Sequence, residues 1–115
     1  MSAIDELLGR EYDRQSSNCL HFAAEAWEVL TGDSRLRQVR EDDFKAGKLA
    51  ALFRGYRRVP GPTVTPSIVL MQTLEREAHI AICYRRRMLH SSEMGPTNLP
   101  FDAMAPLYRN MRFYA

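Results

Sequence analysis

The spacing of apolar residues changes along the chain from a helical pattern to an alternating one. In the first half, four residues recur every three or four positions and form one stripe on a helical wheel: Cys19, Ala23, Ala26 and Leu30. This spacing predicts a helix that begins near Cys19 and ends at about residue 31. Gly32 follows at once and suits the left-handed conformation that ends many helices. Shorter helices are predicted over about 3–8 and 42–53.

The second half of the chain consists of short apolar runs separated by polar residues, prolines and glycines. Four of these runs predict strands, at residues 68–71, 79–84, 88–90 and 112–114. Pro96 and Pro100 indicate a loop between the last two runs. Helices followed by strands predict an α+β fold, in which N-terminal helices pack on a small antiparallel sheet.

Composition and charge narrow the class of protein. A length of 115 residues suits one domain, so residues 1–115 are expected to form a single domain. The net charge of +2 is too small to indicate nucleic-acid binding. The chain has no apolar run of membrane-spanning length and no signal-peptide pattern, so the sequence predicts synthesis in the cytoplasm and no membrane span. Its two cysteines lack the paired spacing of a zinc site.

Cys19 is the first candidate for chemistry, because it opens the predicted central helix. Asn18 is a good N-cap residue and would make Cys19 the first helical position. Free N–H groups and the helix dipole at that position favour a thiolate and lower the cysteine pKa. His21 lies on the opposite face of the helix and is not expected to act as a base for Cys19. The alternative is that Cys19 is simply the first core residue of the apolar stripe.

Two histidines supply the second candidate feature. His79 shares one strand face with Ala81 and Cys83, and an even-length hairpin loop would place His90 directly opposite His79. If the cysteine-led helix packs on that same face, the three side chains have the geometry of nucleophile, base and orienting residue. The alternative is two unrelated polar residues near a strand end.

These segments resemble the NlpC-type cell-wall cysteine peptidases, a branch of the papain-like superfamily. The family has a cysteine that opens a helix, a Pro-rich turn into a strand, a strand that begins with histidine, and a second polar residue about a dozen positions on. The matching segments here are residues 18–22, 65–71, 79–84 and 88–91. Small phage-encoded members, some of them associated with the virion tail, have a similar size.

The resemblance implies a papain-like fold of the NlpC type, with the nucleophile at a helix N-terminus. It makes Cys19 the nucleophile, His79 the general base and His90 the orienting residue, with Tyr12 and Asn18 as candidates for substrate binding or the oxyanion site. The implied reaction is hydrolysis of amide bonds in peptidoglycan stem peptides, with no metal or organic cofactor. A virion location and contacts with other phage tail proteins are implied as well.

The chain also departs from the family pattern beside the cysteine. It has Asn18 where the family usually has aspartate, and Leu20 and His21 where serine and glycine are common. The CHAP-type amidase-peptidases are a related alternative. A second alternative, from a different functional class, is a structural or interaction component on the same fold, such as a phage tail protein, that has lost its chemistry.

Overall fold

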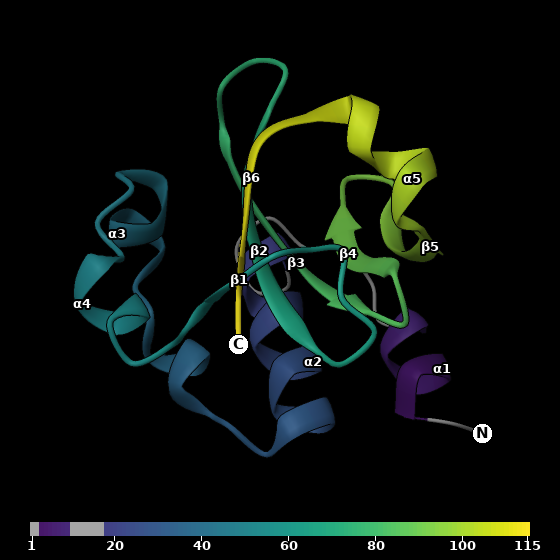
Figure 1. Cartoon of the computed structure of the whole chain (residues 1–115), viewed down its shortest axis with the longest axis horizontal. Coiled ribbons are helices and arrows are strands. Elements are labelled where there is room, and N and C mark those ends of the chain that lie inside the picture. The colour runs from purple at the N-terminus through teal and green to yellow at the C-terminus, as the bar shows by residue number, and fades with distance from the viewer. Residues whose placement is uncertain (1–2, 10–17) are drawn as a thin grey trace.

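The strands of the protein form one antiparallel sheet (Figure 1). The computed structural model describes residues 3–9 and 18–115. Within these residues the sheet has six strands in the order β1-β6-β2-β3-β4-β5. The strands are β1 (Arg58–Val59), β2 (Ser67–Thr73), β3 (Ala78–Tyr84), β4 (Arg87–Ser92), β5 (Gly95–Pro100) and β6 (Tyr108–Tyr114).

Most of the helical residues precede the sheet in the chain. The α-helices are α1 (Ala3–Leu8), α2 (Cys19–Thr31), α3 (Glu41–Lys45), α4 (Ala50–Phe53) and α5 (Phe101–Met104), and the 3-10 turns are η1 (Arg35–Gln38) and η2 (Ala105–Leu107). The predicted α+β class with an antiparallel sheet is therefore confirmed, as are the limits of α1 and α2. No helix in the described ranges is long and apolar enough to cross a membrane.

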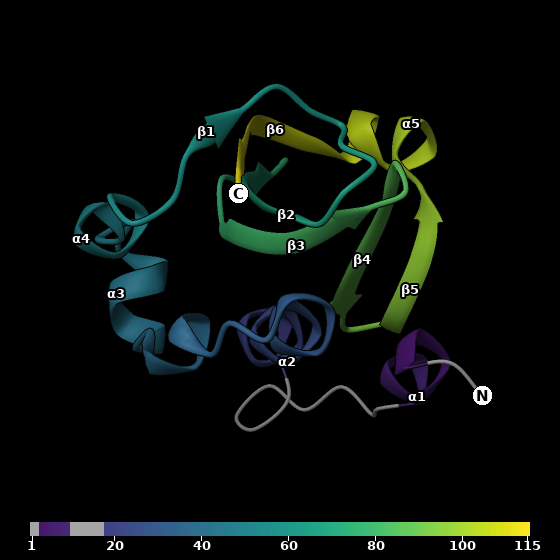
Figure 2. The same ribbon diagram turned by 60° about the horizontal axis from the view of Figure 1, so that its bottom comes forward.

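The sheet separates two hydrophobic clusters. Figure 2 shows α2 on one side of β3, while β6 and β1 curl over the other side. The central strands contribute Ile80, Ile82 and Leu89 to the cluster on the α2 side. They contribute Ala81, Cys83 and Met88 to the opposite cluster, which also holds Phe101 and Phe113. Strict alternation along β3 and β4 thus gives each face of the sheet its own core.

The prediction that α2 packs on the face of His79, Ala81 and Cys83 is wrong. The helix packs instead on the face of Ile80 and Ile82. Two isoleucines present more apolar surface to a helix than alanine, cysteine and histidine do, so burial favours the observed arrangement.

Two predicted element boundaries are also wrong. The single helix expected over 42–53 is divided into α3 and α4, and Gly47 between them has a φ of 71°, a left-handed conformation that a continuous helix excludes. The expected loop at Pro96 and Pro100 is strand β5, which pairs along β4. Proline is tolerated there because β5 is an edge strand, where an N–H on the outer side is not needed.

Replacing Ile82 tests the cluster on the α2 side. Ile82 is fully buried, so I82A is expected to lower the free energy of unfolding by about 2–5 kcal/mol through lost apolar burial and a residual cavity. Urea denaturation monitored by circular dichroism would measure this change. The matched control is V64A, because Val64 is 56% exposed and its truncation should change stability by less than about 0.5 kcal/mol. Equal losses in the two variants would contradict this account of the core.

Candidate active site

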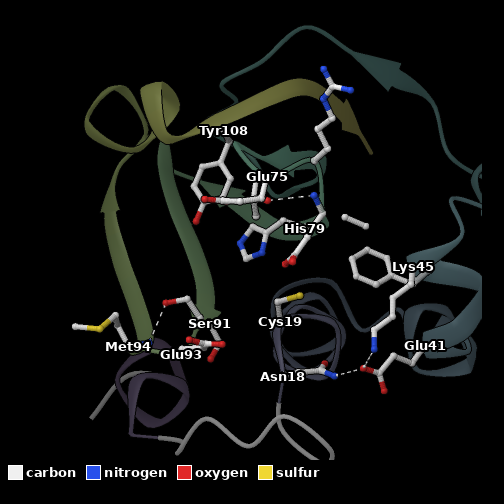
Figure 3. A pocket seen from close by; sticks show the side chains of 16 residues that line it. Asn18, Cys19, Glu41, Lys45, Glu75, His79, Ser91, Glu93, Met94 and Tyr108 are labelled. Carbon is white, nitrogen blue, oxygen red and sulfur yellow. Dashed lines mark hydrogen bonds and ion pairs between the residues drawn. The ribbon is translucent and has the colours of Figure 1, made fainter.

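Cys19 stands where the N-terminus of α2 meets an open pocket. It is half-buried, packs against the core cluster on the α2 side and also lines the pocket (Figure 3). Cys19 is therefore a core-packing residue and a pocket residue at once, so the two interpretations of the sequence do not exclude each other.

The surroundings of Cys19 favour its neutral form. Burial raises the pKa of the thiol, and the nearby Glu41 carboxylate raises it further, while backbone N–H groups of Ile80, Leu20 and Cys19 act in the opposite direction. The prediction of a lowered cysteine pKa is therefore wrong, because desolvation outweighs the favourable N–H groups of the first helical turn. At neutral pH the resting side chain is a protonated thiol.

His79 and His90 form a direct hydrogen bond between β3 and β4. Nε2 of His79 lies 2.9 Å from Nδ1 of His90, and both side chains are buried. Their rings are nearly perpendicular, at 88°. Within the described part of the chain, the buried Nε2 of His90 has no hydrogen-bond partner. The ring of His79 is thus held from one nitrogen, which leaves its Nδ1 available to another group.

The predicted register of the two histidines is wrong by two residues. The hairpin turn consists of Arg85 and Arg86 alone, and the ladder pairs Ile82 with Leu89. Continuing that register sets His90 level with Ala81, so the two histidines are diagonal neighbours on one face. Diagonal side chains are farther apart than directly opposed ones but remain within reach of aromatic rings.

Both imidazoles are neutral at ordinary pH. Burial lowers the pKa of His79 to about 3, with a smaller effect from the charge of His90. Burial also lowers the pKa of His90 to about 4. A hydrogen bond between two neutral imidazoles uses one N–H donor and one nitrogen acceptor. When Nε2 of His79 is the donor, Nδ1 of His79 has a free electron pair. His79 is then in the tautomer that a general base requires.

Cys19 and His79 line the same pocket at one end of the sheet although they come from opposite sides of it. The backbone N–H of Ile80, the residue after His79, is one of the groups that act to lower the pKa of the Cys19 thiol. Figure 3 shows Cys19 at the start of α2 and His79 above it, both on the lining of this pocket. Because His79 is the second residue of β3, its ring reaches the pocket at the strand end.

The pocket is lined by charges of both signs. Its charged lining residues are Glu41, Glu75, Glu77, Glu93, Lys45 and Arg76. They come from α3 and from the turns that follow β2 and β4, so the pocket is bounded by loops at one end of the sheet. Among the described residues, no group of three or more His, Cys, Asp or Glu side chains could hold a metal ion.

The side chain of Asn18 caps the start of α2 and also binds a neighbouring carboxylate, that of Glu41. Its Oδ1 accepts hydrogen bonds from the backbone N–H groups of Leu20 and His21, at 3.0 and 3.2 Å. Its Nδ2 donates to Oε1 of Glu41 at 2.9 Å, and Glu41 also pairs with Lys45 at 3.2 Å. An asparagine can make both kinds of contact, because its amide carries an acceptor and a donor.

The remaining candidates from the sequence have different outcomes. His21 is exposed, and its Nδ1 accepts a hydrogen bond from the N–H of Asn18, which completes the helix cap rather than serving Cys19. Tyr12 lies outside the described residues. The sequence interpretation missed Glu41 and Tyr108, which both line the pocket, because their distances along the chain from Cys19 give no local signal.

Comparisons of the chain with protein-family models, with curated proteins and with solved structures find no significant match. The resemblance to the NlpC-type peptidases therefore stays a prediction.

The two buried imidazoles should make the protein less stable in mild acid. In the unfolded chain a histidine binds a proton near pH 6.5, whereas folded His79 and His90 do so only near 3 and 4. Between these values the unfolded state binds more protons, so the free energy of unfolding falls as pH falls. The expected loss is about 2 kcal/mol for each ring between pH 6.5 and 5.

Urea titrations at pH 7, 6 and 5 would measure this pH dependence. An H90N variant should show a smaller fall between pH 7 and 5, even if it is less stable throughout. V64A, which alters an exposed and non-titrating side chain, is the matched control and should keep the wild-type slope. If H90N kept the wild-type dependence of stability on pH, the His79–His90 pair would not be the cause of the fall in stability in acid.

Replacing Asn18 tests the link between the helix cap and Glu41. An N18D variant keeps a capping oxygen but loses the donor to Glu41 and sets two carboxylates against each other. We expect a loss of about 1–3 kcal/mol in the free energy of unfolding. The double variant N18D/E41Q restores a donor–acceptor pair and should recover most of that loss. Thermal denaturation of both variants would measure it, and equal instability of the single and double variants would argue against the link.

Proposed function

We propose that this protein is a cysteine hydrolase that cleaves amide bonds, with Cys19 as nucleophile, His79 as general base and His90 as the residue that orients His79. The observation that carries this proposal is the 2.9 Å bond from Nε2 of His79 to Nδ1 of His90, beside a pocket that Cys19 also lines. That bond leaves Nδ1 of His79 as the nitrogen that can serve the thiol. Nucleophile, base and orienting group are the minimum set for this chemistry.

The reaction begins from a neutral pair. As Sγ of Cys19 attacks the amide carbonyl carbon, the thiol proton moves to Nδ1 of His79 and a sulfur–carbon bond forms. Collapse of the tetrahedral intermediate breaks the carbon–nitrogen bond, and His79 gives its proton to the leaving amine. Water then attacks the thioester and returns a proton through His79, which releases a carboxylic acid and the free thiol.

The start of α2 offers donors for the oxyanion. The backbone N–H of Cys19 belongs to the first turn of the helix, where such groups lack partners within the helix. Directed at the developing negative charge, it would stabilise the tetrahedral intermediate. Asn18 contributes by holding this turn in place, because its side-chain oxygen caps the helix and its nitrogen donates to Glu41.

We further propose that the substrate is a peptidoglycan stem peptide and that the fold is papain-like, of the NlpC type. The order of elements supports this: a cysteine at the start of α2, a strand after a proline turn, His79 at the start of β3 and His90 on β4. The pocket charges also suit a ligand with both amine and carboxylate groups, as stem peptides have, because Glu41, Glu75 and Arg76 lie along one opening.

A second candidate is a structural or interaction protein on the same scaffold that has lost its activity. The raised pKa of Cys19 favours this candidate, because an activated thiol is usually one whose pKa is lowered. The His79–His90 bond favours the enzyme, because two buried imidazoles lower stability below neutral pH and hold one ring nitrogen of His79 in place beside the pocket.

Turnover of muropeptides separates these two candidates. Purified protein incubated with defined muropeptides should yield products that have gained one water, as detected by mass spectrometry. C19A should lower the rate by at least about 10³-fold, because the attacking atom is gone. C83A is the matched control: Cys83 is fully buried on the opposite face of the sheet, so its removal should leave turnover near the wild-type level.

Thermal denaturation of each variant would verify that it is folded. Equal turnover in C19A and wild type would exclude Cys19 as nucleophile. No turnover of any muropeptide by folded wild-type protein would favour the structural candidate.

A further inference from the structure

Tyr108 lies flat against the ring of His79. The two ring centroids are 4.9 Å apart and the planes differ by 11°, which is a stacked arrangement. The same tyrosine meets His90 edge-on, at 6.0 Å and 87°. Tyr108 therefore contacts both members of the histidine pair from a strand that neither belongs to, and it lines the pocket (Figure 3).

A β-bulge in β6 places the side chain of Tyr108 on the sheet face that carries His79. Along β2, Leu70 pairs with Arg112, whereas Gln72 pairs with Arg109, so β6 has one residue more than β2 between these pairs. Without the extra residue, alternation from Phe113 would direct Arg109, not Tyr108, to the face that carries His79.

Asn110 accommodates the bulge. It has a φ of 57°, a left-handed conformation that asparagine tolerates better than most residues, and its Nδ2 donates to Oε1 of Gln72 at 2.6 Å. Beyond the bulge, Tyr108 packs with Met111 against the same cluster as Phe113. Bulges are common where a strand must redirect a side chain next to a functional site.

We propose that Tyr108 is a positioning residue for His79: its ring fixes the plane of the imidazole, so that Nε2 stays on His90 and Nδ1 faces the Cys19 side of the pocket. The catalytic consequence rests on the proposed function, whereas the effect on the His79 ring does not. The hydrogen bond to His90 restrains one ring nitrogen but allows the ring to rotate about it. A parallel aromatic face removes that freedom and excludes water from one side of His79.

The groups that contact His79 or share its pocket come from every element around it. They are Cys19 from α2, His90 from β4 and Tyr108 from β6, with Glu75 and Glu77 of the β2–β3 turn lining the same pocket. Of these, Tyr108 covers the ring face itself. Its removal should therefore expose that face to water, whereas the hydrogen bond to His90 can persist.

The test is nuclear magnetic resonance of the imidazole nitrogens in the full chain labelled with nitrogen-15. In wild type we expect His79 in the Nε2–H tautomer, with protonation only in strong acid. Y108F retains the flat ring and should leave both properties unchanged. Y108A should raise the His79 pKa by at least about one unit and mix its tautomers, because water reaches the exposed face.

An unchanged His79 tautomer and pKa in Y108A would overturn the proposal. A Y108F variant that behaves like Y108A would also overturn it, because the hydroxyl rather than the ring would then be responsible. If Y108A fails to fold, Y108L supplies similar apolar bulk without a flat face: it should mix the His79 tautomers, as Y108A does, but shift the His79 pKa less, because water stays excluded. N110G, which keeps the left-handed conformation of the bulge, should leave His79 as in wild type.

Muropeptide turnover forms a separate arm of the experiment. In an active enzyme, Y108A should lower kcat by about tenfold with little change in KM, and Y108F should retain the wild-type kcat. If wild type shows no turnover but the nitrogen spectra follow the expected pattern, the proposed function fails and the positioning role of Tyr108 stands. If turnover is present and the spectra do not change in Y108A, the positioning role fails alone.

Discussion

The hydrogen bond between His79 and His90 is the interaction on which the candidate site depends. It joins two buried imidazoles across β3 and β4, and it determines which nitrogen of His79 is left for chemistry. Burial lowers the pKa of both rings, so the bond forms between neutral partners. A core of apolar side chains alone would be more stable in acid. The pair therefore carries a cost in stability at acid pH.

The sheet imposes a second constraint, because Cys19 and His79, the proposed nucleophile and base, belong to opposite faces. α2 packs on the side of Ile80, whereas His79 points to the side that β6 covers. The two can share a pocket only at the strand end, where the first turn of α2 and the second residue of β3 lie side by side. Shifts of α2 would move the Cys19 sulfur relative to His79 and the rest of this pocket. Asn18 opposes such shifts through its bonds to the helix start and to Glu41.

Asn18 is matched to its neighbour Glu41. The side chain of Glu41 accepts a hydrogen bond at this position, and an aspartate could not donate one. The carboxylate of Glu41, from α3, therefore lies beside the start of α2 and lines the pocket. Tyr108 is a comparable contribution from a distant element, brought to His79 by one extra residue in β6. Glu41 and Tyr108 both act on the site through contacts between segments that are far apart in the sequence, so no local motif indicates them.

The sequence by itself determined the elements with strong periodicity: α2 from Cys19 to its glycine cap, the strands around His79 and His90, and the α+β class. These features follow from local apolar spacing and capping chemistry, which act over a few residues. Only the tertiary structure decided which face of the sheet α2 covers, the diagonal register of the histidines and the raised pKa of Cys19. Each of these depends on burial summed over several elements, and on a two-residue turn whose length sets the pairing of everything beyond it.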